Sequence, residues 1–100
     1  MDKALNLLGL ARRSGHLICG TDSVIKALQK GQLQLIILAL DASSKTQDKI
    51  VKKAHFYAID VIQSFDAAAL QKATGTKSLV FGIDDVGFKN AICKEVIPER

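Results

Sequence analysis

The chain alternates between segments with apolar residues at helical spacing and short runs that are almost continuously apolar. Near the start, Leu5, Leu8 and Ala11 recur on one face and predict a helix over Asp2–Arg13. The apolar runs are too short for buried helices and predict strands. The longest of them, Leu33–Leu40, has almost no polar positions, which predicts a central strand covered on both faces.

Three further strands are expected, at His16–Cys19, Ile59–Gln63 and Ser78–Ile83, the first of them an edge strand. Four further helices should each open on a residue whose side-chain oxygen can accept from the first turn. The candidate caps, in chain order, are Thr21 or Asp22, then Ser43, Ser44 or Thr46, then Ser64 or Asp66, and finally Asp84 or Asp85.

Glycines and apolar stripes complete the expected helices. Gly31 should end the second helix and Gly75 the fourth. The third helix should bury a stripe of Ile50, Val51, Ala54 and Tyr57, and the last should run through Phe88, Ala91 and Ile92. The end of the chain, Pro98-Glu99-Arg100, should fray.

Strand and helix alternate along the whole sequence, which predicts an α/β fold with a sheet between helical layers. A chain of 100 residues suits one domain over residues 1–100, and a 48% apolar composition with a single proline favours a compact core. The five aromatic residues include no Trp, which disfavours a sheet platform for stacking bases.

The charge is mildly basic, with 14 Lys and Arg against 10 Asp and Glu and a net charge of +4. Such a balance suits a polyanionic partner. Four of the lysines lie between Lys45 and Lys53, with Asp48 as the only acid there. These lysines are either an electrostatic contact surface or the solvated face of a helix.

Catalytic and metal-binding patterns are not recognisable. Cys19 and Cys93 stand alone among apolar residues, which indicates reduced, buried thiols, and His16 and His55 are solitary. We expect no catalytic activity, no metal and no cofactor. The sequence shows no signal peptide and no apolar run long enough to span a membrane, so we expect a cytoplasmic protein.

One enzymatic alternative depends on carboxylates. Asp41 follows the strand Leu33–Leu40, and Asp84-Asp85 follow Ser78–Ile83. Functional groups of α/β folds gather beyond the carboxyl ends of strands, and three carboxylates there could hold magnesium for phosphoryl transfer. We favour the alternative in which all three residues cap the helices that follow.

The segment Gly20–Lys26 is the strongest candidate site. A glycine lets a partner approach the backbone closely, and the N–H groups of the first helical turn carry partial positive charge. Lys26 stands about one turn into the helix. The same residues also suit an ordinary capped helix start.

Four segments, taken in their order along the chain, resemble motifs of the ribosomal protein L7Ae and L30e superfamily of kink-turn RNA binders. Gly20–Lys26 resembles its Gly-x-Asn-Glu-x-x-Lys segment, and Leu8–Gly15 opens the chain as in small stand-alone bacterial members. Leu38–Ser43 resembles Leu-Ala-x-Asp-Ala-Ser, and Leu70–Gly75 resembles Leu-Gly-x-Ala-x-Gly. The resemblance covers nearly the whole chain.

The resemblance implies a three-layer α-β-α sandwich around a four-stranded mixed sheet. It also implies binding of a kink-turn, or a similar G·A-containing internal loop, in ribosomal or other non-coding RNA. The start of the second helix would enter the RNA groove beside sheared G·A pairs. Gly20 and Thr21 would approach the RNA, Asp22 and Ser23 would face guanine edges, and Lys26 would contact a guanine or a phosphate.

Flanking residues extend this predicted surface. Arg12 and Arg13 could reach phosphates, and Thr76 and Lys77 could contact the RNA backbone. Asp22 and Ser23 replace the family's Asn and Glu, which removes donors and shortens reach. A protein-interaction module of the same fold therefore stays an alternative. We expect a monomer, and association with the ribosome is left open.

Overall fold

The computed structural model describes residues 2–96, which form five helices and four strands. Their alternation confirms the α/β class. The predicted fraying of Pro98–Arg100 lies outside the described residues. In chain order the elements are α1 (Lys3–Arg13), β1 (Leu17–Cys19), α2 (Thr21–Gln29), β2 (Leu35–Leu38), α3 (Ser44–Phe56), β3 (Asp60–Ile62), α4 (Ala67–Thr74), β4 (Val80–Ile83) and α5 (Val86–Glu95).

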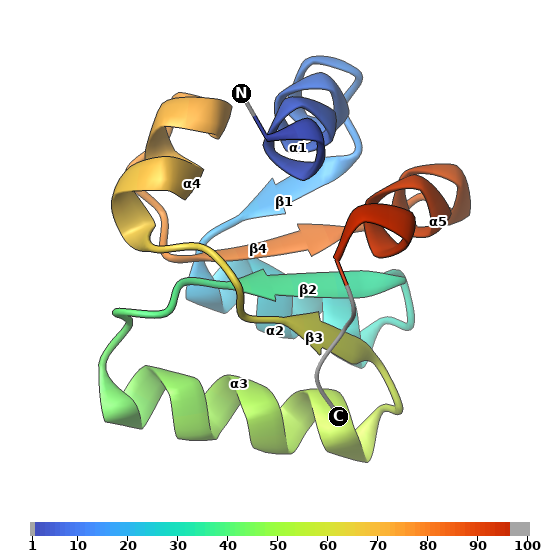
Figure 1. Ribbon diagram of the computed structural model, residues 1–100. Helices are drawn as coiled ribbons and strands as arrows, with labels where there is room; N and C mark the ends of the chain where they lie inside the picture. The colour runs from blue at the N-terminus through green and yellow to red at the C-terminus, as the bar shows by residue number, and fades with distance from the viewer. Residues whose placement is uncertain (1, 97–100) are drawn as a thin grey trace.

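The four strands form one mixed sheet in the order β1-β4-β2-β3. β2 pairs with β3 in parallel, whereas β4 runs antiparallel to both of its neighbours, with Leu38 opposite Val80 and Cys19 opposite Phe81. Consequently the carboxyl ends of β1, β2 and β3 all lie at the end of the sheet where β4 begins, which is a row of strand ends and not a lateral strand. We call this the Gly20 edge, after the residue that follows β1; it lies at the left of Figure 1.

Helices cover both faces of this sheet. α1 packs against α4 and α5 on one face, and α2 packs against α3 on the other. Figure 1 shows α1, α4 and α5 above the sheet and α3 below it. The predicted three-layer sandwich with a four-stranded mixed sheet is therefore confirmed.

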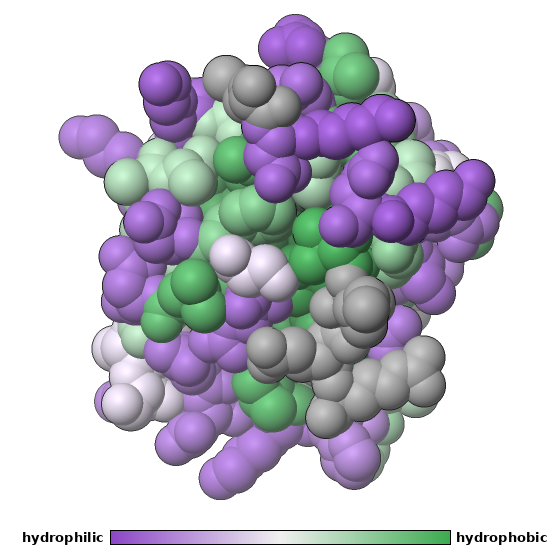
Figure 2. Space-filling view, in the orientation of Figure 1, coloured by the Kyte–Doolittle hydropathy of each residue, from purple (hydrophilic) through white to green (hydrophobic). Residues whose placement is uncertain are grey.

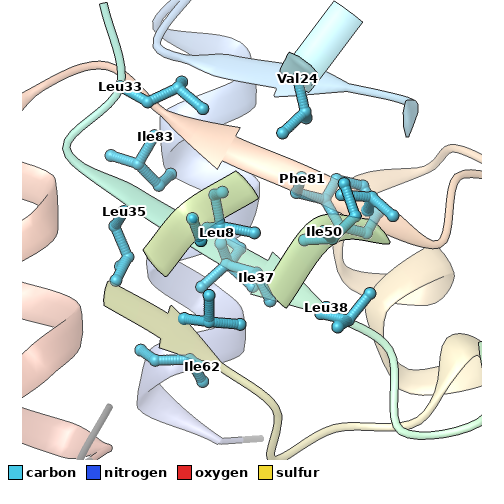
Figure 3. Close-up of a cluster of buried hydrophobic side chains, with 14 of the residues drawn as sticks. Leu8, Val24, Leu33, Leu35, Ile37, Leu38, Ile50, Ile62, Phe81 and Ile83 are labelled. Carbon is cyan, nitrogen blue, oxygen red and sulfur yellow. The ribbon is translucent and has the colours of Figure 1, made fainter. Parts of the chain in front are cut away.

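The core surrounds the two central strands. Every residue of β2 and β4 is buried, and Figure 3 shows Ile37, Phe81 and Leu8 pointing into one cluster. The expected central strand is confirmed, although it is shorter than Leu33–Leu40. The backbone N–H of Leu40 donates to Phe65 O (2.9 Å) rather than to β4, because the chain leaves the sheet there, and the Leu40 side chain is half exposed.

Four of the five helices described within residues 2–96 open on a side-chain cap. Those caps are Asp2, Ser43, Asp66 and Asp85. The predicted stripe of α3 is partly wrong: Ile50 and Ala54 are buried, but Val51 and Tyr57 are exposed. α3 lies beside the edge strand β3, and a sheet margin covers a narrower stripe of helix than its centre does.

We expect Gly9→Ala to destabilise the protein. A methyl group at Gly9 would lie 2.9 Å from the backbone carbonyl oxygen of Ala73, where α1 crosses α4. Alanine gains about 1 kcal/mol of helix propensity, but overpacking against backbone costs about 1–3 kcal/mol. Urea unfolding should therefore show a net loss. Asn6→Ala, at an exposed position of the same helix, is the control; equal stability of both variants would contradict the close contact.

Candidate functional site

The start of α2 differs from the other described helix starts. Its N-cap is Gly20, with φ 99° and ψ 148°, and no side chain accepts from its first turn. The predicted capping by Thr21 or Asp22 is therefore wrong. Gly20 donates its N–H to Val80 O (2.9 Å), so the chain turns at the glycine and Thr21 is already the first helical residue.

The turn leaves backbone accessible at the surface. A Cβ on Gly20 would meet no atom within 4 Å, so open space surrounds the position. Its positive φ nevertheless disfavours any other residue, since this backbone region is open almost only to glycine. First-turn N–H groups of α2 are thus free of side-chain caps, at the positive end of the helix dipole.

Three predicted contact residues lie on exposed positions of α2. Asp22, Ser23 and Lys26 are all exposed, whereas Val24, Ala27 and Leu28 are buried against the core. Asp22 and Lys26 are four residues apart, so they share the outward face of the helix. The carboxylate therefore stands beside the lysine that was predicted to meet RNA.

The loop between α4 and β4 reaches the same edge. The bond from Gly20 to Val80 fastens the end of β1 to the start of β4, directly after this loop. The Thr76 hydroxyl contacts the Thr74 hydroxyl (3.2 Å) and accepts from the Ser78 N–H (3.3 Å), while the Gln71 side chain donates to Lys77 O (3.0 Å). These bonds hold the loop backbone and leave the Lys77 side chain exposed.

Arg12 connects α1 to this edge. Its guanidinium donates to the carbonyl oxygen of Thr74, the last residue of α4. Burial raises the pKa of the Cys19 thiol, and the positive charge of Arg12 partly offsets that rise. Arg12 therefore bonds to the end of α4 and acts electrostatically on the residue before Gly20. Sequence reasoning named Arg12 but not this structural bond.

A basic hollow of about 470 Å³ opens between α1 and α4. Arg12, Arg13 and Lys72 supply three cations to its lining, which includes no carboxylate. Lys72 was missed from the sequence, although its place in the last turn of α4, three residues before Gly75, was a usable signal. The rest of the lining is Gly9, Ala73, Thr74 and Gly75.

The structure contradicts a shared magnesium site. Asp41 follows β2 at the Gly20 edge, whereas Asp84 and Asp85 follow the antiparallel β4 at the opposite edge. Asp85 caps α5, as expected, but Asp41 accepts from Ala67 N (2.7 Å) at the start of α4 instead of capping α3. Within residues 2–96 no three His, Cys, Asp or Glu side chains gather as a metal site.

His16 is not solitary, contrary to the sequence reading. Its Nδ1 lies 2.9 Å from Asp84 Oδ1, and its ring is 6.0 Å from that of Phe88. The pair joins the start of β1 to the loop before α5, away from the Gly20 edge.

Cys19 and Cys93 are free thiols and only half-buried. No described helix is long and apolar enough to cross a bilayer.

Comparison with known proteins identifies relatives over nearly the whole chain. Residues 2–93 match the model of the Ribosomal protein L7Ae/L30e/S12e/Gadd45 family. The chain is 36% identical to the RNA-binding protein YlxQ of Enterococcus faecium, over 86% of this chain and 84% of that protein. It is 33% identical to the RNA-binding protein YlxQ of Bacillus subtilis (strain 168), over 86% of this chain and 87% of that protein.

Solved structures agree on the fold. A protein of unknown function from Bacillus halodurans C superposes with a TM-score of 0.90 at 37% identity, covering 94% of this chain and 96% of that one. The Giardia lamblia 15.5kD RNA binding protein superposes with a TM-score of 0.78 at 18% identity, covering 90% of this chain and 78% of that one. At that identity the second likeness concerns the fold alone.

The electrostatic influence of Arg12 on the Cys19 thiol is open to a direct test. We expect Arg12→Gln to raise the pKa of the Cys19 thiol, because loss of a nearby positive charge disfavours the thiolate. Arg12→Lys should keep most of the effect. The measurement is the pH dependence of Cys19 alkylation, followed by mass spectrometry. Cys93, whose charged neighbours are Lys89 and Asp60, is the internal control. An unchanged Cys19 titration in Arg12→Gln would place the guanidinium elsewhere.

Proposed function

Since the chain belongs to the Ribosomal protein L7Ae/L30e/S12e/Gadd45 family, we propose that it is a non-catalytic protein that binds structured RNA. Its target in this proposal is a kink-turn or a similar G·A-containing internal loop of ribosomal or other non-coding RNA. Two relatives named as RNA-binding proteins, aligned over most of both chains, support the RNA class of partner.

The uncapped start of α2 is the observation that carries the proposal. A helix start without a side-chain cap offers N–H donors and partial positive charge to an electron-rich ligand. The open space over Gly20 allows a base edge or a phosphate to approach the backbone. The other described helix starts have their first turns capped by Asp or Ser and lack this opening.

Each exposed residue of the first turns has a role in the proposed complex. Asp22 and Ser23 face guanine edges, where a carboxylate accepts from amino and imino groups and a hydroxyl donates or accepts over a shorter reach. Lys26 contacts a guanine or a phosphate. Because Asp22 stands one turn before Lys26 on the same face, it lowers the positive potential that Lys26 offers.

Basic residues of α1, α4 and the loop before β4 would contact the RNA backbone in the proposed complex. Arg13, Lys72 and Lys77 are exposed and form no salt bridge within residues 2–96. Arg12 already uses part of its guanidinium on Thr74 O, so it positions the end of α4 and offers only its remaining donors to phosphate. The Thr76 hydroxyl is likewise engaged within the loop.

A protein-interaction role is the second candidate, and one feature favours it. A groove of about 770 Å³ follows the edge strand β3 between α3 and α5. Val51, Ala54 and Val61 supply apolar lining, with Lys52 and Lys89 among the polar residues. An edge strand beside an apolar groove suits an added peptide strand. The groove lies along β3, whereas the uncapped helix start follows β1.

Binding to a kink-turn should depend on its G·A pairs. In calorimetric or gel-shift titrations we expect tighter binding to a kink-turn duplex than to the same duplex with the G·A pairs replaced by Watson–Crick pairs. Higher salt should weaken binding to both, with a slope set by the phosphates neutralised. Equal affinity for the two RNAs would reduce the proposal to general electrostatic attraction.

Lys26→Ala should weaken kink-turn binding by about 1–3 kcal/mol if Lys26 contacts a base edge. If Lys26 meets only phosphate, the loss should be the same for the kink-turn and for the G·A-free duplex. Lys30→Ala is the matched control, since Lys30 is also exposed but follows the last residue of α2. Losses of equal size at the two lysines would remove the special role of Lys26.

The combined change Asp22→Asn and Ser23→Glu should tighten kink-turn binding. It restores an amide with two donors, removes a negative charge close to phosphate, and lengthens the reach at position 23. Asp22→Asn alone should cost about 0.3–1 kcal/mol of stability, because the carboxylate favours the positive end of the α2 dipole. Affinities of parent and double variant are compared on one RNA. A parent that binds as tightly as the double variant would show that these side chains do not read the RNA.

A further inference from the structure

The outward side of α3 carries a line of exposed side chains that contribute no buried residue to the core. Lys45, Lys49, Lys52 and Phe56 follow one another at intervals of four, three and four residues, so they lie along one helix face. All four are exposed. We call them the α3 row. Hydrophilic side chains project along the lower border of the molecule in Figure 2, where α3 runs in Figure 1.

Phe56 is the unusual member of this row. Phe56 is 79% exposed, the highest value among the exposed large apolar residues of the described part of the chain, above Val86 at 57%. The rings of Phe56 and Tyr57 meet edge to face, with centroids 5.0 Å apart and planes at 84°. An aromatic ring held in this way presents a face to solvent and contributes little to the core. A lysine-rich face needs no such ring to stay solvated.

The α3 row begins at the same end of the sheet as the proposed RNA site. α3 starts just after Ser43, at the Gly20 edge where β2 ends, and α2 starts at the same edge. The two helices pack side by side in one layer. Lys45 and Phe56 are separated by 11 residues, or about 16 Å of helix. The row therefore leads from the Gly20 edge to the opposite side of the molecule.

We propose that the α3 row is a second RNA contact, which holds an unpaired strand continuing from the RNA bound at the start of α2. The three lysines neutralise phosphates, and Phe56 stacks on one base. This inference rests on the proposed RNA-binding function. The exposed carboxylate of Asp48 stands one turn from Lys45 and from Lys52 and offsets part of their charge. Three cations that end in one exposed ring still suit a backbone with an unstacked base, since every base has a π-face.

An acidic protein is the competing occupant, and the row suits it less well. Stable protein interfaces centre on a contiguous apolar patch with aromatic anchors, and they are depleted in lysine. The row offers one aromatic ring and three lysines. Val51, an exposed aliphatic residue of α3, lies off the row and lines the groove beside β3, which the row touches only at Lys52.

The test compares two RNAs, a kink-turn duplex with blunt ends and the same duplex with an unpaired oligouridine extension, placed at either end in turn. Wild-type protein should bind one of the extended RNAs more tightly than the blunt one. Phe56→Ala should lose about 5-fold to 150-fold in affinity for that RNA and almost nothing for the blunt RNA. Val86→Ala, at another exposed apolar position, is the matched control and should change neither.

Two further variants separate stacking from apolar contact. Phe56→Tyr keeps a ring and should retain the preference for the extended RNA, whereas Phe56→Leu keeps apolar bulk and should lose it. If leucine serves as well as tyrosine, or if Phe56→Ala affects both RNAs equally, base stacking at Phe56 is refuted. Equal binding of wild type to blunt and both extended RNAs also refutes the proposal.

The lysines are tested through the salt dependence of binding. Lys49→Gln with Lys52→Gln should lower the log–log salt slope on the extended RNA by about 1.4, from about 0.7 for each single-stranded phosphate contact. Lys30→Gln with Lys94→Gln removes the same charge from exposed sites outside the row and should lower it less. Equal slopes would overturn the α3 row as a phosphate contact. Failure of the kink-turn proposal appears separately, as indifference to the G·A pairs in the blunt duplex.

Discussion

The turn at Gly20 is the constraint on which the proposed RNA-binding surface depends. Its N–H donates to Val80 O, which fastens the end of β1 to the start of β4, and its φ of 99° sends the chain directly into α2. A side-chain cap at this place would occupy the N–H groups that a ligand needs. The fold instead leaves the first turn open and supports it through the sheet and the buried face of α2.

The close packing of α1 on α4 is a second interaction that shapes the surface near that turn. Gly9 lets α1 approach the backbone of α4 closely, and this approach lets Arg12 reach the carbonyl oxygen of Thr74. The same guanidinium influences the thiol of Cys19, next to Gly20. Three segments distant in sequence thus meet at one end of the sheet. Packing between α1 and α4, rather than any motif, therefore sets how Arg12 and Arg13 are spaced from Lys72.

The antiparallel direction of the central strand β4 also separates the carboxylates that were considered for a shared magnesium site. Carboxylates that follow β2 and β4 look equivalent in the sequence, because each stands just after a buried apolar run. In the sheet the two strands point in opposite directions, so Asp41 is separated from Asp84 and Asp85 by the length of a strand. Each of the three carboxylates accepts from or pairs with a neighbouring group of the fold, at Ala67, His16 and Phe88 respectively.

Local patterns were enough to predict the α/β class, the order of the elements and the buried β2. They also narrowed three of the helix caps to two or three candidates each, since spacing and capping depend on neighbouring residues. The segments Gly20–Lys26 and Thr76–Lys77 were also named from the sequence as candidate RNA contacts, and they stay predictions. Only the tertiary structure decided that α2 begins at Gly20 without a side-chain cap, that Arg12 donates to the carbonyl oxygen of Thr74, and that Lys72 lines a basic hollow. It also left Val51, Phe56 and Tyr57 exposed. The physical reason is the same throughout: strand direction and helix approach are set by contacts between residues far apart in the chain, which no local pattern records.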